Sequence, residues 1–206
     1  MKVPLSKLEM ATYAASLLPS NCSVNLGIGL PSLVAENIDS QKNIMIHSEN
    51  GVLGVSGRPK RNDVSPTLIN AGKETIKIKP GASFFDSSLS FGMIRGGHID
   101  FCILGAMEVD SYGNLANWMI PGKKITGMGG AMDLVNGAKK VIILMNHFNK
   151  KGEVKLKLKT KLPLTGLAVV NEVITELGHF SPQNGSFKII KIFKGLNERD
   201  CLLPKE

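Results

Sequence analysis

The sequence predicts a single α/β domain over residues 1–206, in which helices flank an open and mostly parallel sheet. Short apolar runs rich in β-branched residues alternate with segments of helical periodicity, which is the pattern of a layered α/β fold. Several of these runs end in polar or glycine-rich turns, and ligands in such folds bind beyond the carboxyl ends of the strands. A chain of 206 residues is also long enough to bury a core.

The first half is expected to begin with an amphipathic helix, because apolar or small residues recur there at helical spacing: Leu5, Leu8, Thr12 and Ala15. Lys7 and Glu9 interrupt the apolar run that a signal peptide would need, so we do not interpret this segment as one. We expect strands at residues 24–26, 43–47, 74–79 and 101–109, and a helix at 31–38 that begins with a proline.

The second half is expected to contain a helix, two strands, a mixed segment and two turns. These are the helix at 131–138, strands at 141–145 and 187–193, a strand-to-helix passage within 167–177, and turns at 110–114 and 149–152. Lysines at positions 155, 157, 159 and 161 would share one face of a strand. We interpret that face as a solvent-exposed edge and not as a nucleic-acid stripe, because it has no base-stacking aromatic residues.

Composition excludes several classes of protein. The chain has no uncharged apolar run of roughly 18 residues, so no membrane span is expected. Its three cysteines and four histidines are widely spaced, which predicts neither a disulfide framework nor a metal site and favours a reducing compartment. The net charge of +8 suits nucleic acid or a polyanionic small molecule.

Three turns carry candidate functional residues. In the first, two glycines at positions 27 and 29 lie between a strand and a helix, where a ligand can approach the backbone. In the second, Glu49 precedes Asn50-Gly51, a pair that demands a sharp turn with a positive φ. In the third, glycines at 127, 129 and 130 lead into a helix and can direct N–H groups at an oxyanion or phosphate. Each turn alone is also compatible with a purely structural role.

A dinucleotide-binding site is the second interpretation of these turns. Gly27 and Gly29 match the first two glycines of the fingerprint of such sites. Glu49 follows them at about the separation in sequence at which the fingerprint has an acidic residue that binds a ribose. The third glycine of that fingerprint is replaced by Ser32, and the fingerprint does not require the Asn50-Gly51 pair.

Six segments together resemble the B (beta) subunit of the 3-oxoacid CoA-transferase family, the succinyl-CoA:acetoacetate type, over about residues 24–166. In chain order they are Asn25-Leu-Gly-Ile-Gly-Leu-Pro, His47-Ser-Glu-Asn-Gly, Asn70-Ala-Gly-Lys-Glu-Thr, Ala116-Asn-Trp-Met-Ile-Pro-Gly, Gly127-Met-Gly-Gly-Ala-Met-Asp-Leu-Val and Leu162-Pro-Leu-Thr-Gly. The resemblance implies that Glu49 is the catalytic nucleophile. It also implies that Asn25, Gly130 and Ala131 contact CoA and that Lys73 lies near it.

The resemblance further implies a cytoplasmic enzyme with no permanently bound cofactor, for which coenzyme A, as acyl-CoA, and short-chain carboxylic acids are substrates. The glycine-rich loop of the family's other half is absent from the sequence, so the expected partner is the A subunit of the same CoA-transferase, in a heterotetramer of two A and two B subunits. Succinate with acetoacetate is the expected acid pair. Acetate or butyrate with acetoacetate, 3-oxoadipate, and a non-catalytic metabolite sensor of related fold stay open as alternatives.

Overall fold

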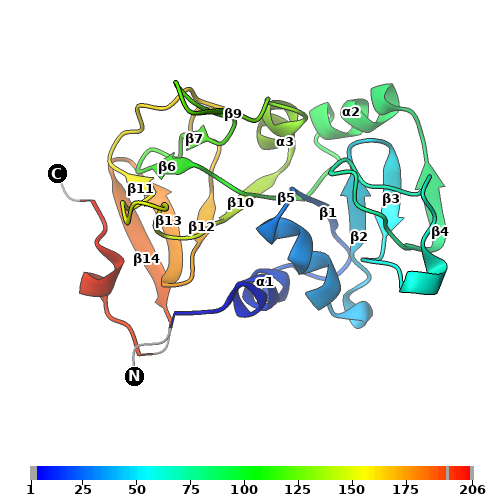
Figure 1. The fold of residues 1–206 in the computed structure, drawn as a ribbon, viewed down its shortest axis with the longest axis horizontal. Helices are drawn as coiled ribbons and strands as arrows, with labels where there is room; N and C mark the ends of the chain where they lie inside the picture. Colours follow the sequence, from blue (N-terminus) through cyan, green and yellow to red (C-terminus); the bar gives the residue numbers. More distant parts are fainter. Residues whose placement is uncertain (1–3, 194, 205–206) are drawn as a thin grey trace.

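The computed structural model describes residues 4–193 and 195–204, which form an α/β fold around one large mixed sheet (Figure 1). Within the described residues this sheet has nine strands. From one edge to the other they are β14 (Ser186–Ile192), β13 (Gly178–Gln183), β12 (Glu172–Ile174), β10 (Lys140–Leu144), β5 (Phe101–Leu104), β1 (Ser23–Leu26), β2 (Met45–Ser48), β3 (Val52–Val55) and β4 (Ile78–Phe84).

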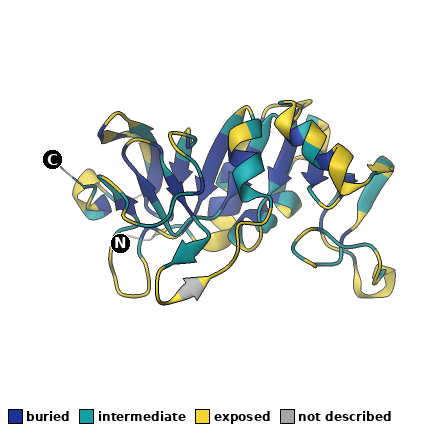
Figure 2. Ribbon diagram, turned by 90° about the horizontal axis from the view of Figure 1, so that it is seen from above, coloured by how far each residue is buried: buried dark blue, intermediate teal, exposed yellow. Residues whose placement is uncertain are grey.

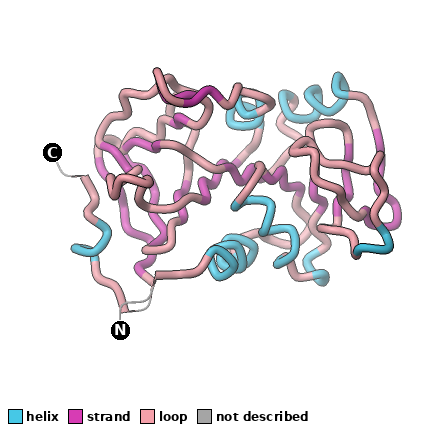
Figure 3. The backbone as a smooth tube through the Cα atoms, viewed as in Figure 1, coloured by secondary structure: helices cyan, strands magenta, loops and turns pink. Residues whose placement is uncertain are grey.

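Shorter elements surround this sheet, and Figure 3 shows how little of the chain is helical. The α-helices are α1 (Lys7–Ser16), α2 (Ser87–Arg95) and α3 (Ala131–Gly137). The 3₁₀ helices are η1 (Leu30–Asn37), η2 (Ser40–Lys42), η3 (Arg61–Asp63) and η4 (Glu198–Cys201). A small sheet contains β11 (Leu156–Lys157), β6 (Glu108–Asp110) and β7 (Leu115–Ala116), and a separate hairpin pairs β8 (Met119–Ile120) with β9 (Lys124–Ile125).

The centre of the large sheet is parallel and both of its edges are antiparallel. Strands β12, β10, β5, β1 and β2 run parallel, whereas β13 and β14 at one edge and β3 and β4 at the other pair antiparallel. The predicted α/β fold is confirmed, with a mixed sheet whose parallel part lies in its interior. The chain leaves β1 for β2 on one side and later returns to β5 on the other, so the carboxyl end of β1 is a topological switch point.

Two apolar cores lie on opposite faces of this sheet because successive strand residues alternate between faces. On β5, Ile103 packs in the core that contains residues of α1, whereas Cys102 and Leu104 pack in the core that contains residues of α2 and α3. In Figure 1, α1 lies below the sheet and α2 and α3 lie above it. Figure 2 shows the central strands as buried between these more exposed layers.

The first helix is confirmed, and Ala15 lies on its buried face as expected, but the other buried residues were not in the predicted set. Ser6 caps α1 through a capping box with Glu9. The buried residues are Met10, Ala11, Ala14 and Ala15. Leu8 was expected on the buried stripe but is 59% exposed, so that part of the prediction was wrong. Small residues dominate the buried face, and an apolar pattern weighted towards leucine misses them.

Two predicted strands have different bounds in the structure. The strand expected at 74–79 begins at Ile78 and continues through Pro80 and Gly81 to Phe84. It lies at the edge of the sheet, where a missing proline N–H is tolerated. The strand expected at 101–109 divides into β5 and β6, because the chain leaves the large sheet after Leu104 and enters the small one.

Two predicted helices also differ. The helix expected at 31–38 is present as η1, but it is a 3₁₀ helix and begins at Leu30. The segment 167–177 contains strand β12 and no helix. A turn closed by the Thr175 N–H and the Gly178 carbonyl, 2.9 Å apart, leads instead into β13, which the sequence analysis did not predict.

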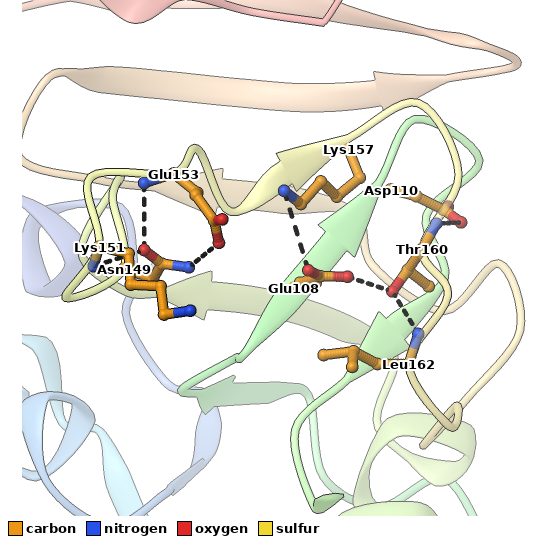
Figure 4. A network of polar contacts seen from close by, with 8 residues as sticks. All are labelled: Glu108, Asp110, Asn149, Lys151, Glu153, Lys157, Thr160 and Leu162. Carbon is orange, nitrogen blue, oxygen red and sulfur yellow. Dashed lines mark hydrogen bonds and ion pairs between the residues drawn. The ribbon is translucent and has the colours of Figure 1, made fainter. Parts of the chain in front are cut away.

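The lysine-rich segment follows the expected turn at 149–152, which Figure 4 shows at close range. Asn149 Oδ1 accepts the backbone N–H groups of Lys151 and Glu153, at 2.8 and 3.0 Å. Strand β11, however, has only two residues and pairs parallel with β6. A four-lysine strand at a solvent-exposed edge was therefore the wrong prediction.

The four lysines also do not share one exposed face. Lys159 and Lys161 are exposed, whereas Lys155 and Lys157 are partly buried. The Nζ atom of Lys157 lies 3.9 Å from Glu108 Oε1, and Figure 4 marks this ion pair with a dashed line. Burial lowers the pKa of Lys155 to about 8. Lys155 and Lys157 are therefore partly buried near Glu108 of the small sheet, and sequence periodicity alone does not show this.

Candidate active site

Glu49 lies at the tip of a tight hairpin between β2 and β3. The Gly51 N–H donates to the Ser48 carbonyl at 3.0 Å, which closes the turn. Gly51 has a φ of +114°, and a Cβ atom there would overlap the Phe85 carbonyl oxygen. The expected sharp turn with a positive φ is therefore confirmed, and only glycine fits its last position.

The residues on either side of Glu49 fix this hairpin to the segment 69–71. Ser48 Oγ accepts the Ala71 N–H at 3.0 Å, and Asn50 Nδ2 donates to the Ile69 carbonyl at 2.8 Å. Ser48 is buried and Asn50 is exposed, whereas Glu49 between them is partly exposed. The backbone at Glu49 is thus anchored on both sides, while its carboxylate stays accessible.

Asn25 provides a hydrogen bond to this carboxylate. Its Nδ2 atom donates to Glu49 Oε2 at 3.0 Å, and its side chain is fully buried. Asn25 lies opposite His47 in the parallel pairing of β1 with β2. Glu49 follows His47 by two residues and so projects towards the same face of the sheet. The structure thereby brings together two of the residues that the sequence analysis selected, Asn25 and Glu49.

His47 is a third member of this group, and the sequence analysis gave it no role. Its Nδ1 atom lies 3.1 Å from Asn25 Nδ2, and its Nε2 atom lies 3.0 Å from Ser90 Oγ on α2. Its ring stacks on Phe85 with centroids 6.2 Å apart. Burial lowers the pKa of His47 to about 4, so the ring is neutral near pH 7.

The sequence does contain signals for this contact. The two-residue spacing from His47 to Glu49 predicts a shared face on any strand. Asp86 precedes the helix that carries Ser90 and caps it, with its side chain accepting the Leu89 N–H at 2.8 Å. Only the fold, however, shows that this helix crosses above β2.

Gly130 lies directly beside Glu49. A Cβ atom at Gly130 would be 3.2 Å from Glu49 Cγ and 3.3 Å from Phe91 Cζ. Gly130 is the N-cap of α3, and Ala131 is the first residue of that helix. The Ala131 N–H donates to the Met128 carbonyl at 3.1 Å, so it is engaged within the loop in this structure.

A small cleft, open to solvent, lies in front of Glu49. Its lining residues are Leu26, Gly27, Ile28, Ser48, Glu49, Asn70, Ala71 and Gly72. Two of the sequence motifs, at residues 25–31 and 70–75, thus form its walls. Lys73 follows Gly72, is exposed, and does not line this cleft. Its N–H donates to the Asn70 carbonyl at 2.9 Å, which holds the loop on which it lies.

A buried thiol lies beside the polar groups of the site. Cys102 on β5 lies opposite Asn25 and is completely buried. Burial raises the pKa of the Cys102 thiol well above its usual range, and the nearby charge of Glu49 raises it further. The described residues contain no group of three or more His, Cys, Asp or Glu that could hold a metal ion. The Glu49 carboxylate is thus held by a neutral amide donor, Asn25.

Comparison with known proteins identifies the family. The family model for coenzyme A transferase matches residues 8–189. The chain belongs to the coenzyme A transferase family. The B subunit of succinyl-CoA:3-ketoacid coenzyme A transferase from Helicobacter pylori is 56% identical over 184 residues, which cover 89% of this chain and 88% of that protein. A probable B subunit of the same enzyme from Bacillus subtilis is 51% identical and covers 93% and 88%.

Two further coenzyme A transferases bear on substrate and fold. The beta subunit of the acetate CoA-transferase of Haemophilus influenzae is 53% identical over 158 residues, covering 77% of this chain and 70% of that protein. An acyl-CoA transferase structure from Escherichia coli superimposes with a TM-score of 0.74 at 20% identity. The match covers 97% of this chain and 40% of that longer one, and at this identity it supports the fold alone.

Proposed function

We propose that this chain is the catalytic-glutamate subunit of a 3-oxoacid CoA-transferase that moves CoA from succinyl-CoA to acetoacetate. One observation carries the proposal: the Glu49 carboxylate lies at the mouth of a cleft, held by the Asn25 amide at 3.0 Å and facing the bare backbone at Gly130. A positioned carboxylate needs no general base, because it attacks in its ionised form. The names and identities of the relatives support this reaction and these substrates.

The first half of the reaction makes a covalent glutamyl–CoA thioester. A Glu49 oxygen attacks the thioester carbonyl of succinyl-CoA, the carbon–sulfur bond breaks, and CoA leaves as its thiolate. A mixed anhydride of Glu49 and succinate remains. The thiolate then attacks the glutamyl carbonyl of this anhydride. The anhydride bond breaks, succinate leaves as the carboxylate, and Glu49 carries CoA through a thioester.

The second half repeats these steps in reverse with the acceptor acid. The acetoacetate carboxylate attacks the glutamyl thioester and expels CoA thiolate, and this thiolate attacks the acetoacetyl carbonyl of the new anhydride. Acetoacetyl-CoA forms and the Glu49 carboxylate is restored, with no net transfer of protons. The anhydride and the thioester react with water, so the assembled site has to exclude it.

Each addition at the glutamyl carbonyl places negative charge on a Glu49 oxygen. The Asn25 N–H that donates to Oε2 in the ionised enzyme is placed to stabilise that charge. We assign Gly130 and Ala131 to contacts with CoA or with the developing oxyanion. Use of the Ala131 N–H requires that it first leave the Met128 carbonyl. Lys73, exposed beside the cleft, is proposed to contact the CoA phosphates.

The proposed enzyme includes a second, different subunit. The relatives are named as B or beta subunits, which supports pairing of this single domain with an A subunit. We propose a heterotetramer of two A and two B subunits in the cytoplasm. None of the helices in the described part of the chain has the length and hydropathy that crossing a bilayer requires.

Acetate as the donor or acceptor acid is the second candidate, favoured by the 53% identity to an acetate CoA-transferase subunit. Both reactions use the same glutamate chemistry and differ in the acid bound. Rates with paired acids distinguish them: the proposal requires faster turnover with succinyl-CoA and acetoacetate than with acetyl-CoA and acetoacetate. The dinucleotide-binding interpretation is replaced by membership of the coenzyme A transferase family.

Trapping of the covalent intermediate tests the role of Glu49. The chain is co-expressed with its partner subunit, incubated with succinyl-CoA, treated with borohydride and analysed by peptide mass spectrometry. Reduction of the thioester should convert the Glu49 side chain to a primary alcohol. Glu49→Ala should abolish both this product and turnover, while the matched surface variant Glu36→Ala keeps both. Wild-type turnover by Glu49→Ala would refute the proposal.

A second assay tests the dependence on a partner. The purified chain is given succinyl-CoA and acetoacetate, with and without the A subunit. We expect turnover only when both proteins are present. Full turnover by the chain alone would contradict the two-subunit organisation and would leave the glutamate chemistry to be decided by the trapping experiment.

A further inference from the structure

We propose that His47 is a positioning residue that holds the Asn25 amide in the one orientation that donates to Glu49. This inference rests on the proposed nucleophilic role of Glu49. His47 does not touch the carboxylate itself. It acts through Asn25, whose Nδ2 atom lies 3.1 Å from His47 Nδ1 and 3.0 Å from Glu49 Oε2.

The two neighbours of the Asn25 amide determine which way it faces. The ionised Glu49 carboxylate can only accept hydrogen bonds, and an unprotonated His47 Nδ1 also accepts. The Asn25 NH₂ group has two N–H donors and satisfies both acceptors at once. In the flipped orientation Oδ1 would face the carboxylate, which places two acceptors against each other.

The observed orientation of the Asn25 amide leaves its oxygen without a hydrogen bond in the part of the chain that the structure describes. Asn25 Oδ1 is buried and has no hydrogen-bond partner among the described residues. A buried carbonyl oxygen without a partner destabilises the fold, so an amide free to turn would rotate until this oxygen found a donor. The acceptor at His47 Nδ1 opposes that rotation, because it binds the second N–H of the same amide.

Ser90 provides the hydrogen-bond partner of the other ring nitrogen of His47. If Nδ1 accepts from Asn25, the ring proton is on Nε2, which lies 3.0 Å from Ser90 Oγ and donates to it. Ser90 is fully buried on α2, and its backbone N–H donates to the Asp86 carbonyl at 3.1 Å. A series of hydrogen bonds thereby connects a helix on one face of the sheet, through His47 and Asn25, to Glu49.

The competing explanation is that His47 only fills space against Phe85. Two substitutions separate the size of the His47 side chain from its hydrogen-bond acceptor. His47→Leu keeps most of the volume and removes the acceptor. His47→Asn is smaller but places an amide oxygen near the position of Nδ1. A packing role predicts that His47→Asn is the more harmful change, whereas a positioning role predicts the reverse.

The test measures kcat and KM of the complex with its partner subunit for both variants. We expect His47→Leu to lower kcat by about 10- to 100-fold with little change in KM for succinyl-CoA, because misplacement of a catalytic group by an ångström can cost this much. His47→Asn should recover most of that loss. His147→Leu is the control for loss of stability. It removes another fully buried histidine, which is hydrogen-bonded to Thr175 and to the Cys201 carbonyl. We expect the folded fraction of this variant to keep the wild-type kcat.

Nitrogen NMR of the histidines in the wild-type complex gives a second readout that needs no variant. We expect an unprotonated Nδ1 and a protonated Nε2 for His47, and the opposite tautomer would overturn the inference. A wild-type kcat in His47→Leu, or equal losses in the Leu and Asn variants, would also overturn it. Loss of activity in Glu49→Ala alongside full activity in His47→Leu refutes this inference alone, whereas activity in Glu49→Ala refutes the proposed function.

Discussion

Substitution of Gly130 by alanine tests whether catalysis needs the empty space beside the Glu49 side chain. Gly130 has a φ of −80° and a ψ of 1°, which alanine adopts without strain. The backbone should therefore accept the change, so the fold should remain intact. Any loss of activity then comes from the added methyl group itself.

The structure gives the size of the effect. The new Cβ would lie 3.2 Å from Glu49 Cγ and 3.3 Å from Phe91 Cζ. Carbon atoms in favourable contact are about 3.5–4.0 Å apart, so one of these side chains has to move by a few tenths of an ångström. We expect kcat to fall about tenfold, which corresponds to about 1.4 kcal/mol of transition-state stabilisation. Gly130→Val, with two further methyl groups, should lower kcat much more.

The assay measures succinyl-CoA:acetoacetate turnover and the unfolding temperature of the complex with its partner subunit. Gly92→Ala is the matched control, because Gly92 is an exposed glycine of α2 with no atom within 4 Å of an added Cβ. It should raise helix stability by about 0.5–1 kcal/mol and leave turnover unchanged. Equal turnover of Gly130→Ala and wild type would show that the reaction at Glu49 does not depend on the missing side chain at this position.

Two further predictions concern stability. Gly51→Ala should destabilise the chain by about 3 kcal/mol or more in a denaturant titration, because it combines a positive φ with overlap at the Phe85 carbonyl; a midpoint equal to wild type would contradict this. The hydrogen bond from His179 and the ion pair with Lys140 hold the pKa of Glu172 at about 2. A lowered pKa stabilises the fold at pH values above about 4.5, the pKa of the unfolded chain. Because solvent screens this half-buried group, Glu172→Gln should cost only about 1–2 kcal/mol at pH 7. The difference in unfolding free energy between the two proteins should shrink as the pH falls from about 4.5 towards 2, and a constant difference would refute the assignment.

The sequence alone determined the local features of this protein. Short apolar runs predicted β1, β2, β10 and β14 within a few residues. The signal is clearest for β10, because burial on both faces of the sheet interior leaves a continuous apolar run. The Asn50-Gly51 pair predicted the turn after Glu49, since a positive φ is a property of the residue itself. The ordered motifs were sufficient for the family, and the family model and the relatives confirmed it.

Only the tertiary structure decided which side chains meet. Asn25 contacts His47 because β1 and β2 are neighbours in parallel register, and strand order is not a local property of the chain. Ser90 reaches His47, and Gly130 reaches Glu49, because α2 and the start of α3 both lie above the carboxyl ends of those strands. The prediction for the lysine-rich segment was wrong for the same reason. Its alternation indicated an exposed face, but packing in the small sheet buries part of that face. A periodic pattern gives the face of an element, whereas the partner of that face depends on contacts between residues far apart in sequence.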